Sequence, residues 1–231
     1  MNMEIFHLIL IKPLLNLLIF IYNFLPGSDM GLAIIAVTIL VRIILFPSFQ
    51  KSLKAQRQLG ELQPKLEEIK EKYKDDKEAQ TKATLEFYKT NKINPFSSCL
   101  PLLIQLPLLL ALYRVFRSGL AGQIVGELYS FVANPGVINT KFLGILELST
   151  PSLVLAVLAG VSQFAQSKLM IPKTKTAKDK TANMMNLQLT YFMPVITVII
   201  ARGLPAGLSL YWITTTLFAI GQQWYIMRRH G

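Results

Sequence analysis

The sequence predicts an all-α integral membrane protein with five transmembrane helices, an N-terminal interfacial helix and a cytoplasmic helical hairpin. Hydrophobic residues make up 52% of the 231 residues and charged residues only 16%, and the mean hydropathy is +0.42. Most of the charge is also concentrated in one segment between apolar ones. Because soluble domains of this size seldom have such a composition, an unusually apolar soluble helical protein is the less favoured alternative.

Catalysis or metal binding by cysteine and histidine is not expected. Cys99 is the only cysteine, so the chain forms no internal disulfide and no multi-cysteine metal site. The two histidines, His7 and His230, lie at opposite ends of the chain. The sequence also lacks the G-x4-GK[ST] loop that binds nucleotide phosphates. We therefore expect a protein that is not an enzyme and that needs no metal or other cofactor.

Residues 1–29 form the first segment, which we interpret as an extracytoplasmic helix lying in the membrane interface. Its apolar run, residues 5–27, is interrupted by Lys12, Pro13 and Asn16. A signal peptide would have a basic start, an unbroken apolar stretch and small residues at a cleavage site, and these features are missing. A sixth transmembrane span over the same residues is the alternative.

Five later apolar segments approach the length that crosses a hydrocarbon core of ~30 Å at 1.5 Å per residue. The predicted spans are residues 30–50, 97–117, 151–170, 185–201 and 207–227. After the second, third, fourth and fifth spans, the sequence predicts in turn an extracytoplasmic loop at 118–150, a cytoplasmic loop at 171–184, an extracytoplasmic turn at 202–206 and a cytoplasmic tail at 228–231. Pro101 and Pro107 leave backbone carbonyls unpaired within the second span, so we expect both prolines to face neighbouring helices.

Residues 51–96 differ from the apolar segments and predict a water-exposed helical hairpin. Residues 51–94 contain 11 Lys or Arg and 8 Asp or Glu. Successive apolar residues step by four, three and four, which places them along one face of a helix: Leu62, Leu66, Ile69 and Tyr73. The sequence KDDK at 74–77 is a turn candidate, and we expect a break or kink around Gly60–Pro64.

The distribution of basic residues predicts the orientation in the membrane. Eighteen of the 24 Lys and Arg residues lie in the hairpin segment, next to or within the 171–184 loop, or in the tail. By the positive-inside rule these parts face the cytoplasm, and five spans then place the N-terminus outside. The net charge of +11 is mainly a topology signal, so DNA is not an expected partner. The lack of an Arg/Ser-rich amphipathic leader favours a bacterial plasma membrane over an organelle.

The first span contains a permanent cation, Arg42, in the sequence VTILVRIILFP (37–47). Asp29 and Lys51 bracket the span, so Arg42 lies about 20 Å from one end and about 13 Å from the other. A central arginine costs ~2.5–3.5 kcal/mol on insertion scales. Two interpretations are open: Arg42 reaches the cytoplasmic headgroups or a structural ion pair, or it lines a hydrated cavity.

None of the five spans contains Asp or Glu. Arg42 therefore has no carboxylate within the spans to pair with, and it must meet water, backbone carbonyls or polar side chains. The polar candidates within the spans are Thr38 one helical turn away, Gln105, Ser162, Gln163, Gln166, Ser167, Tyr211, Trp212 and Thr214–Thr216. Each of them alone is typical of helix–helix contacts. Together with Arg42 they indicate a hydrated cavity within the bundle.

Six segments, in chain order, carry a family resemblance. They are VTILVRIILFP, LQPKLEEIKEKYK, NKINPFSSCLPLLIQLPLLLALYRVF, LAGVSQFAQSKL, FMPVITVIIARGLPAGLSLYW and QQWYI. Their order and spacing resemble the YidC/Oxa/Alb membrane protein insertases, over roughly residues 5–229 and without the large extracytoplasmic domain of the longer bacterial members. The resemblance implies five core helices around a hydrophilic groove that opens to the cytoplasm and to lipid.

The resemblance also assigns residues to this groove. The family's groove arginine corresponds to Arg42, and its threonine one turn earlier corresponds to Thr38. The glutamine of the third span corresponds to Gln163, and the aromatic residue that ends PAGLSLYW corresponds to Trp212. Gln105 of the second span joins them as one of the polar candidates described above. The family's cytoplasmic hairpin corresponds to about residues 51–94.

The resemblance implies a membrane protein insertase and chaperone. Its substrates would be nascent membrane proteins, whose polar flank enters the groove while the apolar segment moves into the lipid bilayer. A Sec-type translocase and the ribosome are candidate partners, although strong ribosome docking through a four-residue tail is not expected. A small-solute transporter or channel is the alternative function. It would be expected to contain internal repeats, whereas the five spans are dissimilar and odd in number.

Overall fold

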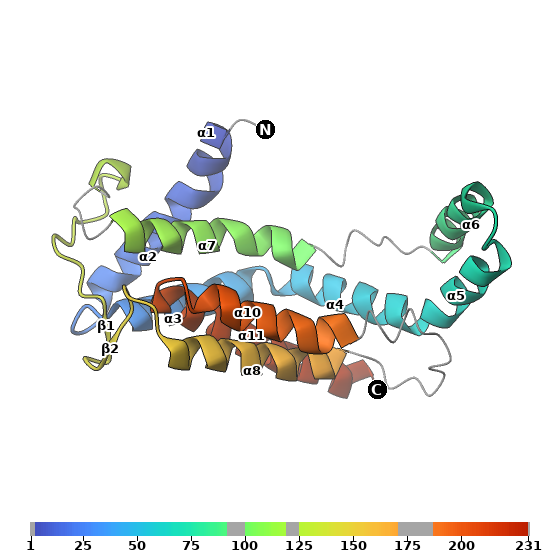
Figure 1. Ribbon diagram of the computed structural model, residues 1–231. Coiled ribbons are helices and arrows are strands. Elements are labelled where there is room, and N and C mark those ends of the chain that lie inside the picture. The colour runs from blue at the N-terminus through green and yellow to red at the C-terminus, as the bar shows by residue number, and fades with distance from the viewer. Residues whose placement is uncertain (1–2, 92–99, 119–124, 171–186, 231) are drawn as a thin grey trace.

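The computed structural model describes residues 3–91, 100–118, 125–170 and 187–230, and these are mostly helical, which confirms the predicted α-helical class. Figure 1 shows the long helices running side by side as a bundle. In chain order the helices are α1 (Met3–Phe6), η1 (His7–Ile11), α2 (Lys12–Phe24), α3 (Met30–Ile44), α4 (Phe46–Glu61), α5 (Gln63–Lys72), α6 (Lys77–Thr90), α7 (Leu100–Ser118), η4 (Val125–Glu127), α8 (Leu153–Met170), η5 (Gln188–Phe192), α10 (Met193–Ala201) and α11 (Ala206–His230).

Three helices follow the predicted spans closely. Within the described residues, α7, α8 and α11 cover most of the spans predicted at 97–117, 151–170 and 207–227. The predicted loop at 171–184 lies outside the described residues, as does the junction at 92–99.

Helix α11 lies at the centre of the bundle. It packs against α8, α3 and α7, while α8 also packs against α10, and α2 packs against α3 and α7. Close approach is needed where α11 begins, because a Cβ atom at Gly207 would collide with the ring of Phe116 on α7. The largest buried apolar side chains therefore come from several helices: Leu15, Leu18 and Ile19 of α2, Met30, Ile34 and Val37 of α3, Leu112 of α7 and Tyr211 of α11.

The N-terminal helix α2 packs into the bundle. Asn16 is buried and accepts a hydrogen bond from the backbone N–H of Tyr129 at 2.7 Å. The hydroxyl of the buried Tyr22 accepts one from the backbone N–H of Asn139 at 2.7 Å. The run Glu4–Phe24 has a mean hydropathy of 2.1, so by length and composition it could cross a bilayer.

Two π-helical turns accommodate prolines. η1 ends at Ile11, two residues before Pro13, and η5 ends at Phe192, two residues before Pro194. A proline lacks its N–H, and its ring clashes with the carbonyl four residues earlier. A single π turn widens the helix at that position, so both helices continue past the proline instead of ending.

The first predicted span, residues 30–50, is divided in the structure, which corrects the expectation of one continuous helix. α3 ends at Ile44 and α4 begins at Phe46, with a bend of 68° between them. Pro47 lies in the first turn of α4, where its missing N–H has no helical partner to lose. α4 then continues to Glu61, so no helix ends at the expected boundary near residue 51.

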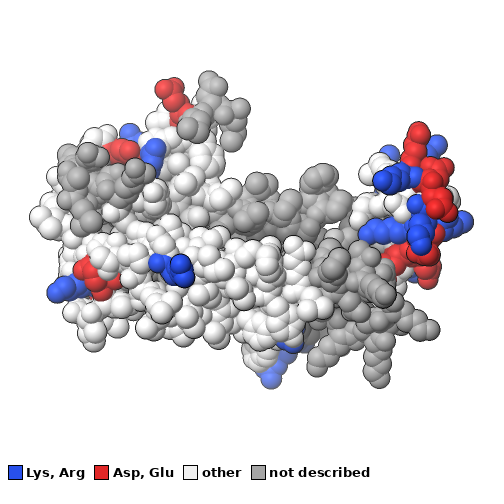
Figure 2. All heavy atoms as spheres, in the orientation of Figure 1, with Lys and Arg blue, Asp and Glu red and all other residues white. Residues whose placement is uncertain are grey.

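The hairpin segment forms α4, α5 and α6, with a break at Leu62 inside the predicted Gly60–Pro64 region. α5 and α6 pack on each other, and Leu66 is buried on the predicted apolar face. Asp76 begins α6 by accepting hydrogen bonds from the backbone N–H groups of Glu78 and Ala79. Figure 2 shows Lys, Arg, Asp and Glu gathered over this end of the molecule.

The described part of the loop at 118–150 contains two short strands that the sequence did not predict. β1 (Lys141–Phe142) pairs antiparallel with β2 (Leu146–Glu147). After β2, the hydroxyl and backbone N–H of Ser149 donate to the Glu147 carboxylate at 2.6 and 3.0 Å. These hydrogen bonds, the side-chain one first, lower the pKa of Glu147.

Candidate functional site

Arg42 lies on the interior face of α3. The buried residues of this helix form one stripe, in which Ile34, Thr38 and Arg42 follow one another at intervals of one turn. Arg42 is only 8% exposed. The opposite face of α3 carries exposed apolar side chains such as Ile43, at 57% exposure. The cation therefore points into the bundle and away from the apolar outer surface.

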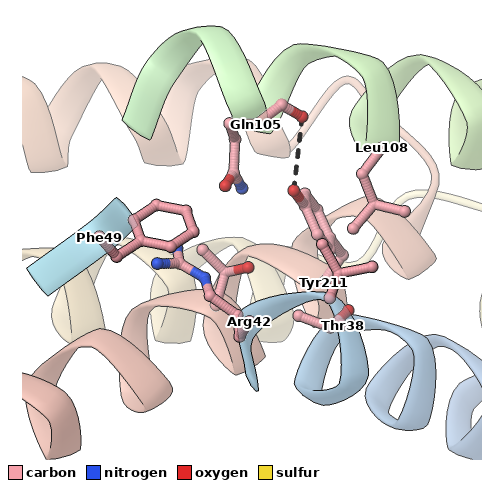
Figure 3. Close-up of a pocket in the computed structure, with 8 residues that line it drawn as sticks. Thr38, Arg42, Phe49, Gln105, Leu108 and Tyr211 are labelled. Atoms are coloured by element: carbon pink, nitrogen blue, oxygen red, sulfur yellow. Dashed lines mark hydrogen bonds between the residues drawn. The ribbon is translucent and has the colours of Figure 1, made fainter. Parts of the chain in front are cut away.

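Arg42 lines a small, partly open hollow (Figure 3). Four helices line it, and each contributes at least one polar or aromatic side chain. The lining residues are Thr38, Val41 and Arg42 of α3, Phe49 of α4, Gln105 and Leu108 of α7, and Tyr211 and Thr215 of α11. Three of the five predicted groove residues, Thr38, Arg42 and Gln105, are thus brought together.

The guanidinium of Arg42 faces an aromatic ring. Its Cζ atom lies 4.1 Å from the centroid of the Phe49 ring, close enough for a cation–π contact. Within the described part of the chain, the salt bridges do not involve Arg42, so no carboxylate there lies within 4.0 Å of it. The aromatic face and the polar lining take the place of a counter-ion.

The other polar groups of the hollow are partly held by backbone carbonyls. The Thr38 hydroxyl donates to the carbonyl of Ile34 at 2.6 Å, within its own helix. The Tyr211 hydroxyl donates to the carbonyl of Gln105 at 3.4 Å, which links α11 to α7. Figure 3 shows the Gln105 side chain directed toward Arg42 and Phe49. The amide of Gln105 is therefore placed beside the cation.

Gln163 and Trp212 lie in a different contact and do not line the hollow around Arg42. The Gln163 Oε1 atom of α8 accepts hydrogen bonds from Trp212 Nε1 at 3.0 Å and from Thr197 Oγ1 at 2.7 Å. One side-chain oxygen thus joins α8, α10 and α11. The structure places these two predicted groove residues next to each other but apart from the arginine.

The sequence interpretation did not identify Phe49 or Leu108 as site residues. Phe49 follows Arg42 by seven residues, but the 68° bend between α3 and α4 lies between them, so helical spacing alone does not predict their contact. Leu108 carries no signal either, because it is one of many leucines in α7. Tyr211 and Thr215 were among the polar candidates, and the packing of α11 against α3 selects them.

The site has the properties of a binding surface. It offers one cation, amide and hydroxyl groups, and an aromatic wall in a partly open hollow. Among the described residues, no group of three or more His, Cys, Asp or Glu is placed to hold a metal ion. An acidic or polar peptide segment is the ligand that this chemistry would attract.

The family model, the relatives and the solved structure that match this chain belong to one family. A family model described as the 60Kd inner membrane protein matches residues 20–231. A protein of Fusobacterium nucleatum named membrane protein insertase YidC is 38% identical over 202 residues, which cover 87% of this chain and 88% of that relative. The chain belongs to the YidC family. The predicted family resemblance is thereby confirmed, and the chain is a bacterial membrane protein.

Other YidC proteins extend the comparison. The insertase YidC of Clostridium tetani is 38% identical over 197 residues, covering 85% of this chain and 81% of the relative. That of Oleidesulfovibrio alaskensis is 36% identical over 220 residues, 95% of this chain but only 38% of the relative. A crystal structure of an active YidC insertase with its first transmembrane domain resolved matches with a TM-score of 0.61 and 27% identity, covering 93% of this chain and 46% of that one.

Proposed function

We propose that this YidC family member is a membrane protein insertase and chaperone, and that the hollow around Arg42 receives the polar segment of a nascent membrane protein. One observation carries the proposal: Arg42 is directed into the bundle, beside a hollow lined by polar groups, without a described carboxylate near it. A buried cation that is not neutralised by its own chain is available to a charged or polar guest.

The mechanism follows from desolvation. A polar flank or acidic tail crosses the hydrocarbon region slowly because its hydrogen bonds with water are lost there. Water held around Arg42, with the Gln105 amide, would replace part of these interactions at mid-depth. The hydrophobic segment of the substrate would then leave into lipid, driven by apolar burial. No covalent step and no cofactor are required.

We propose five transmembrane helices, with the hairpin and C-terminus in the cytoplasm and the N-terminus outside. Figure 2 supports this in part: on the face shown, most described charged side chains lie toward the two ends, and only a few basic side chains lie on the surface between them. Three span candidates are bent or shorter than a full crossing: the bent pair α3 and α4, and the apolar stretches Leu153–Leu169 and Thr190–Ala201. Local thinning of the bilayer would accommodate short spans.

Nascent membrane proteins and the surrounding lipid are the proposed partners. The hairpin of α4 to α6 would contact substrate before it enters the hollow. A Sec-type translocase and the ribosome are further candidate partners. Gln163 and Trp212 are proposed as the part of the groove wall where α8, α10 and α11 meet, since their hydrogen bond fixes that wall.

The test compares Arg42→Ala and Arg42→Glu with the wild-type protein in proteoliposomes. The readout is the rate at which a single-span substrate with an acidic tail becomes protected from protease. A hydrogen bond to a charged group contributes ~1.5–3 kcal/mol, so its full loss in the slow step would reduce the rate by about 10- to 100-fold. Arg42→Glu should be slower than Arg42→Ala because it repels the tail.

Two controls make the result specific. Arg202→Ala removes an exposed arginine at the turn between α10 and α11 and should leave insertion unchanged. A substrate whose tail acids are replaced by Asn and Gln should respond less to Arg42→Glu. If both Arg42 variants insert the acidic substrate at the wild-type rate, the electrostatic role is wrong. Ion flux through the same proteoliposomes would instead favour the channel alternative.

A further inference from the structure

The turn between β1 and β2 has an unusual residue in its first central position. The backbone N–H of Ile145 donates to the carbonyl of Phe142 at 3.1 Å, which closes a four-residue turn. Its two central residues, Leu143 and Gly144, have φ angles of 52° and 72°. Positive φ at both central residues defines a type I′ turn, in which Asn, Asp or Gly is strongly preferred at the first position.

Leucine is sterically unfavourable in this position. A bulky side chain rarely adopts φ above zero, because its Cβ atom crowds the backbone. Residues held in such conformations point to a function for the side chain when packing does not explain them. Packing does not explain Leu143, because it is 61% exposed, and Ile145 beside it is 89% exposed. Two large apolar side chains therefore project from a turn that would be more stable with Asn.

The turn is fixed at the start of α3. The backbone N–H of Leu143 donates to Asp29 Oδ2 at 2.6 Å, while Asp29 Oδ1 accepts from the N–H of Leu32 and caps the helix. The ring of Phe142 packs on Gly31, where any Cβ atom would collide with it. The tip of the turn therefore lies within about one turn of the N-terminus of α3, at the edge of the bundle (Figure 1).

We propose that Leu143 and Ile145 form a hydrophobic tip that inserts into the interfacial region of the bilayer, in the leaflet at the N-terminal end of α3. The tip is held beside the N-terminus of α3, where that helix would enter the membrane, and α3 itself exposes apolar side chains from Leu32 onward. Two side chains are far too small a surface for a stable protein interface, which needs ≈ 800 Å² per partner. Lipid is the occupant that fits.

The experiment places an environment-sensitive NBD fluorophore on single cysteines in a Cys99→Ser background in proteoliposomes. Ile145→Cys reports the tip, Val161→Cys on the exposed apolar face of α8 reports lipid, and Lys82→Cys on α6 reports water. The quenchers are lipids with a nitroxide near the headgroup end of the acyl chain and, separately, aqueous iodide. We expect the label at residue 145 to be quenched by lipid at least half as strongly as that at residue 161, and to be protected from iodide.

The inference rests on the membrane placement proposed above, and the controls separate the two. If residue 161 reports lipid while residue 145 behaves like residue 82, the tip lies in water or against another protein, and the inference alone is overturned. If residue 161 also reports water, the proposed membrane placement fails and the tip insertion fails with it.

Leu143→Asn gives a second, independent test. It supplies the preferred residue of a type I′ turn, so the unfolding temperature in detergent should stay the same or rise. Lipid quenching of the label at residue 145 should nevertheless fall at least twofold, because Leu143 is the native apolar side chain of the tip that remains in the labelled protein. A lower unfolding temperature, or unchanged quenching, would overturn the assignment of Leu143 to the lipid.

Discussion

Arg42 shows how a single residue can combine an unfavourable position with a favourable environment. Insertion of an arginine at this depth costs ~2.5–3.5 kcal/mol. The contact with Phe49 at 4.1 Å offsets part of this cost, and the remaining charge is left for water or a guest in the hollow. A carboxylate partner would stabilise Arg42 further but would also neutralise the group that the proposed function needs.

The Arg42–Phe49 contact can be measured by a double-mutant cycle. Phe49→Leu removes the aromatic face and Arg42→Gln removes the charge, and we expect a coupling energy of about 0.5–2 kcal/mol between them. The measurement is the free energy of unfolding in detergent micelles for the four proteins. Phe20→Leu, on the exposed side of α2, is the matched control and should show no coupling to Arg42→Gln. Additive effects for Phe49 would contradict the cation–π contact.

Gln163 is expected to act through its two hydrogen bonds. Gln163→Leu leaves the indole N–H of Trp212 without its acceptor, whereas the Thr197 hydroxyl keeps a bond to the carbonyl of Met193 at 3.1 Å. Hydrogen bonds between membrane helices average ≈ 0.6 kcal/mol with a maximum near 1.7. We therefore expect Gln163→Leu to destabilise the protein by about 0.6–2 kcal/mol, measured by unfolding in detergent. Thr197→Val should cost less, and an equal or larger cost would contradict this assignment of roles.

At the scale of the helices, the sequence predicts most of what local patterns control. The spacing of Leu62, Leu66, Ile69 and Tyr73 predicted a helical face on which Leu66 is buried, and the break at Leu62 falls where Gly60–Pro64 indicated. The division at Leu45 was missed because residues 30–49 are apolar enough to form one continuous span despite Thr38, Arg42 and Ser48, although Pro47 was a local signal for a new first turn. The π turns before Pro13 and Pro194 were not predicted, because they depend on how the backbone relaxes around each proline, and the amino-acid sequence pattern does not indicate this.

The same distinction applies to the site. Thr38 and Arg42 are one turn apart on one helix, so their proximity follows from the sequence. Gln105 joins them only because α7 packs against α4 and α11, and this depends on the whole bundle. The hydrogen bond between Gln163 and Trp212, which are 49 positions apart, is likewise a consequence of packing. A family resemblance supplies the residues of a site but not which of them touch.

Close packing of α8 against α10 depends on Gly160. A Cβ atom there would collide with the side chain of Val198 and lie 3.0 Å from the carbonyl oxygen of Pro194. Membrane helices commonly use small residues for such contacts. We expect Gly160→Ala to destabilise the protein by about 1–3 kcal/mol in detergent unfolding, because the added atom forces the helices apart. Val198→Ala in the same chain should restore most of the loss. If it restores nothing, backbone contact with Pro194 dominates instead.

Over the whole molecule, the bundle and the hairpin differ in composition and in contacts. The bundle has an apolar outer surface around the polar hollow at Arg42, whereas α5 and α6 carry dense charge of both signs (Figure 2). α5 and α6 project at one end and pack mainly on each other and on the end of α4 (Figure 1). This arrangement suggests that membrane anchoring and substrate capture are physically separable.

Replacing Gln63–Asn91 with a short Gly/Ser linker tests this separation, because it keeps α4 in its contacts with α7 and α11. The unfolding temperature of the bundle in detergent should change by less than about 4 °C, which corresponds to ~1 kcal/mol for a chain of this size. Insertion of the acidic single-span substrate by the same variant, measured in proteoliposomes, should slow if the hairpin captures it. A variant that reverses the exposed charges of α6 but keeps Asp76 as its cap is the matched control for the role of charge. A large fall in the unfolding temperature would show that the hairpin stabilises the bundle. An unchanged insertion rate would show that the hairpin does not capture the substrate.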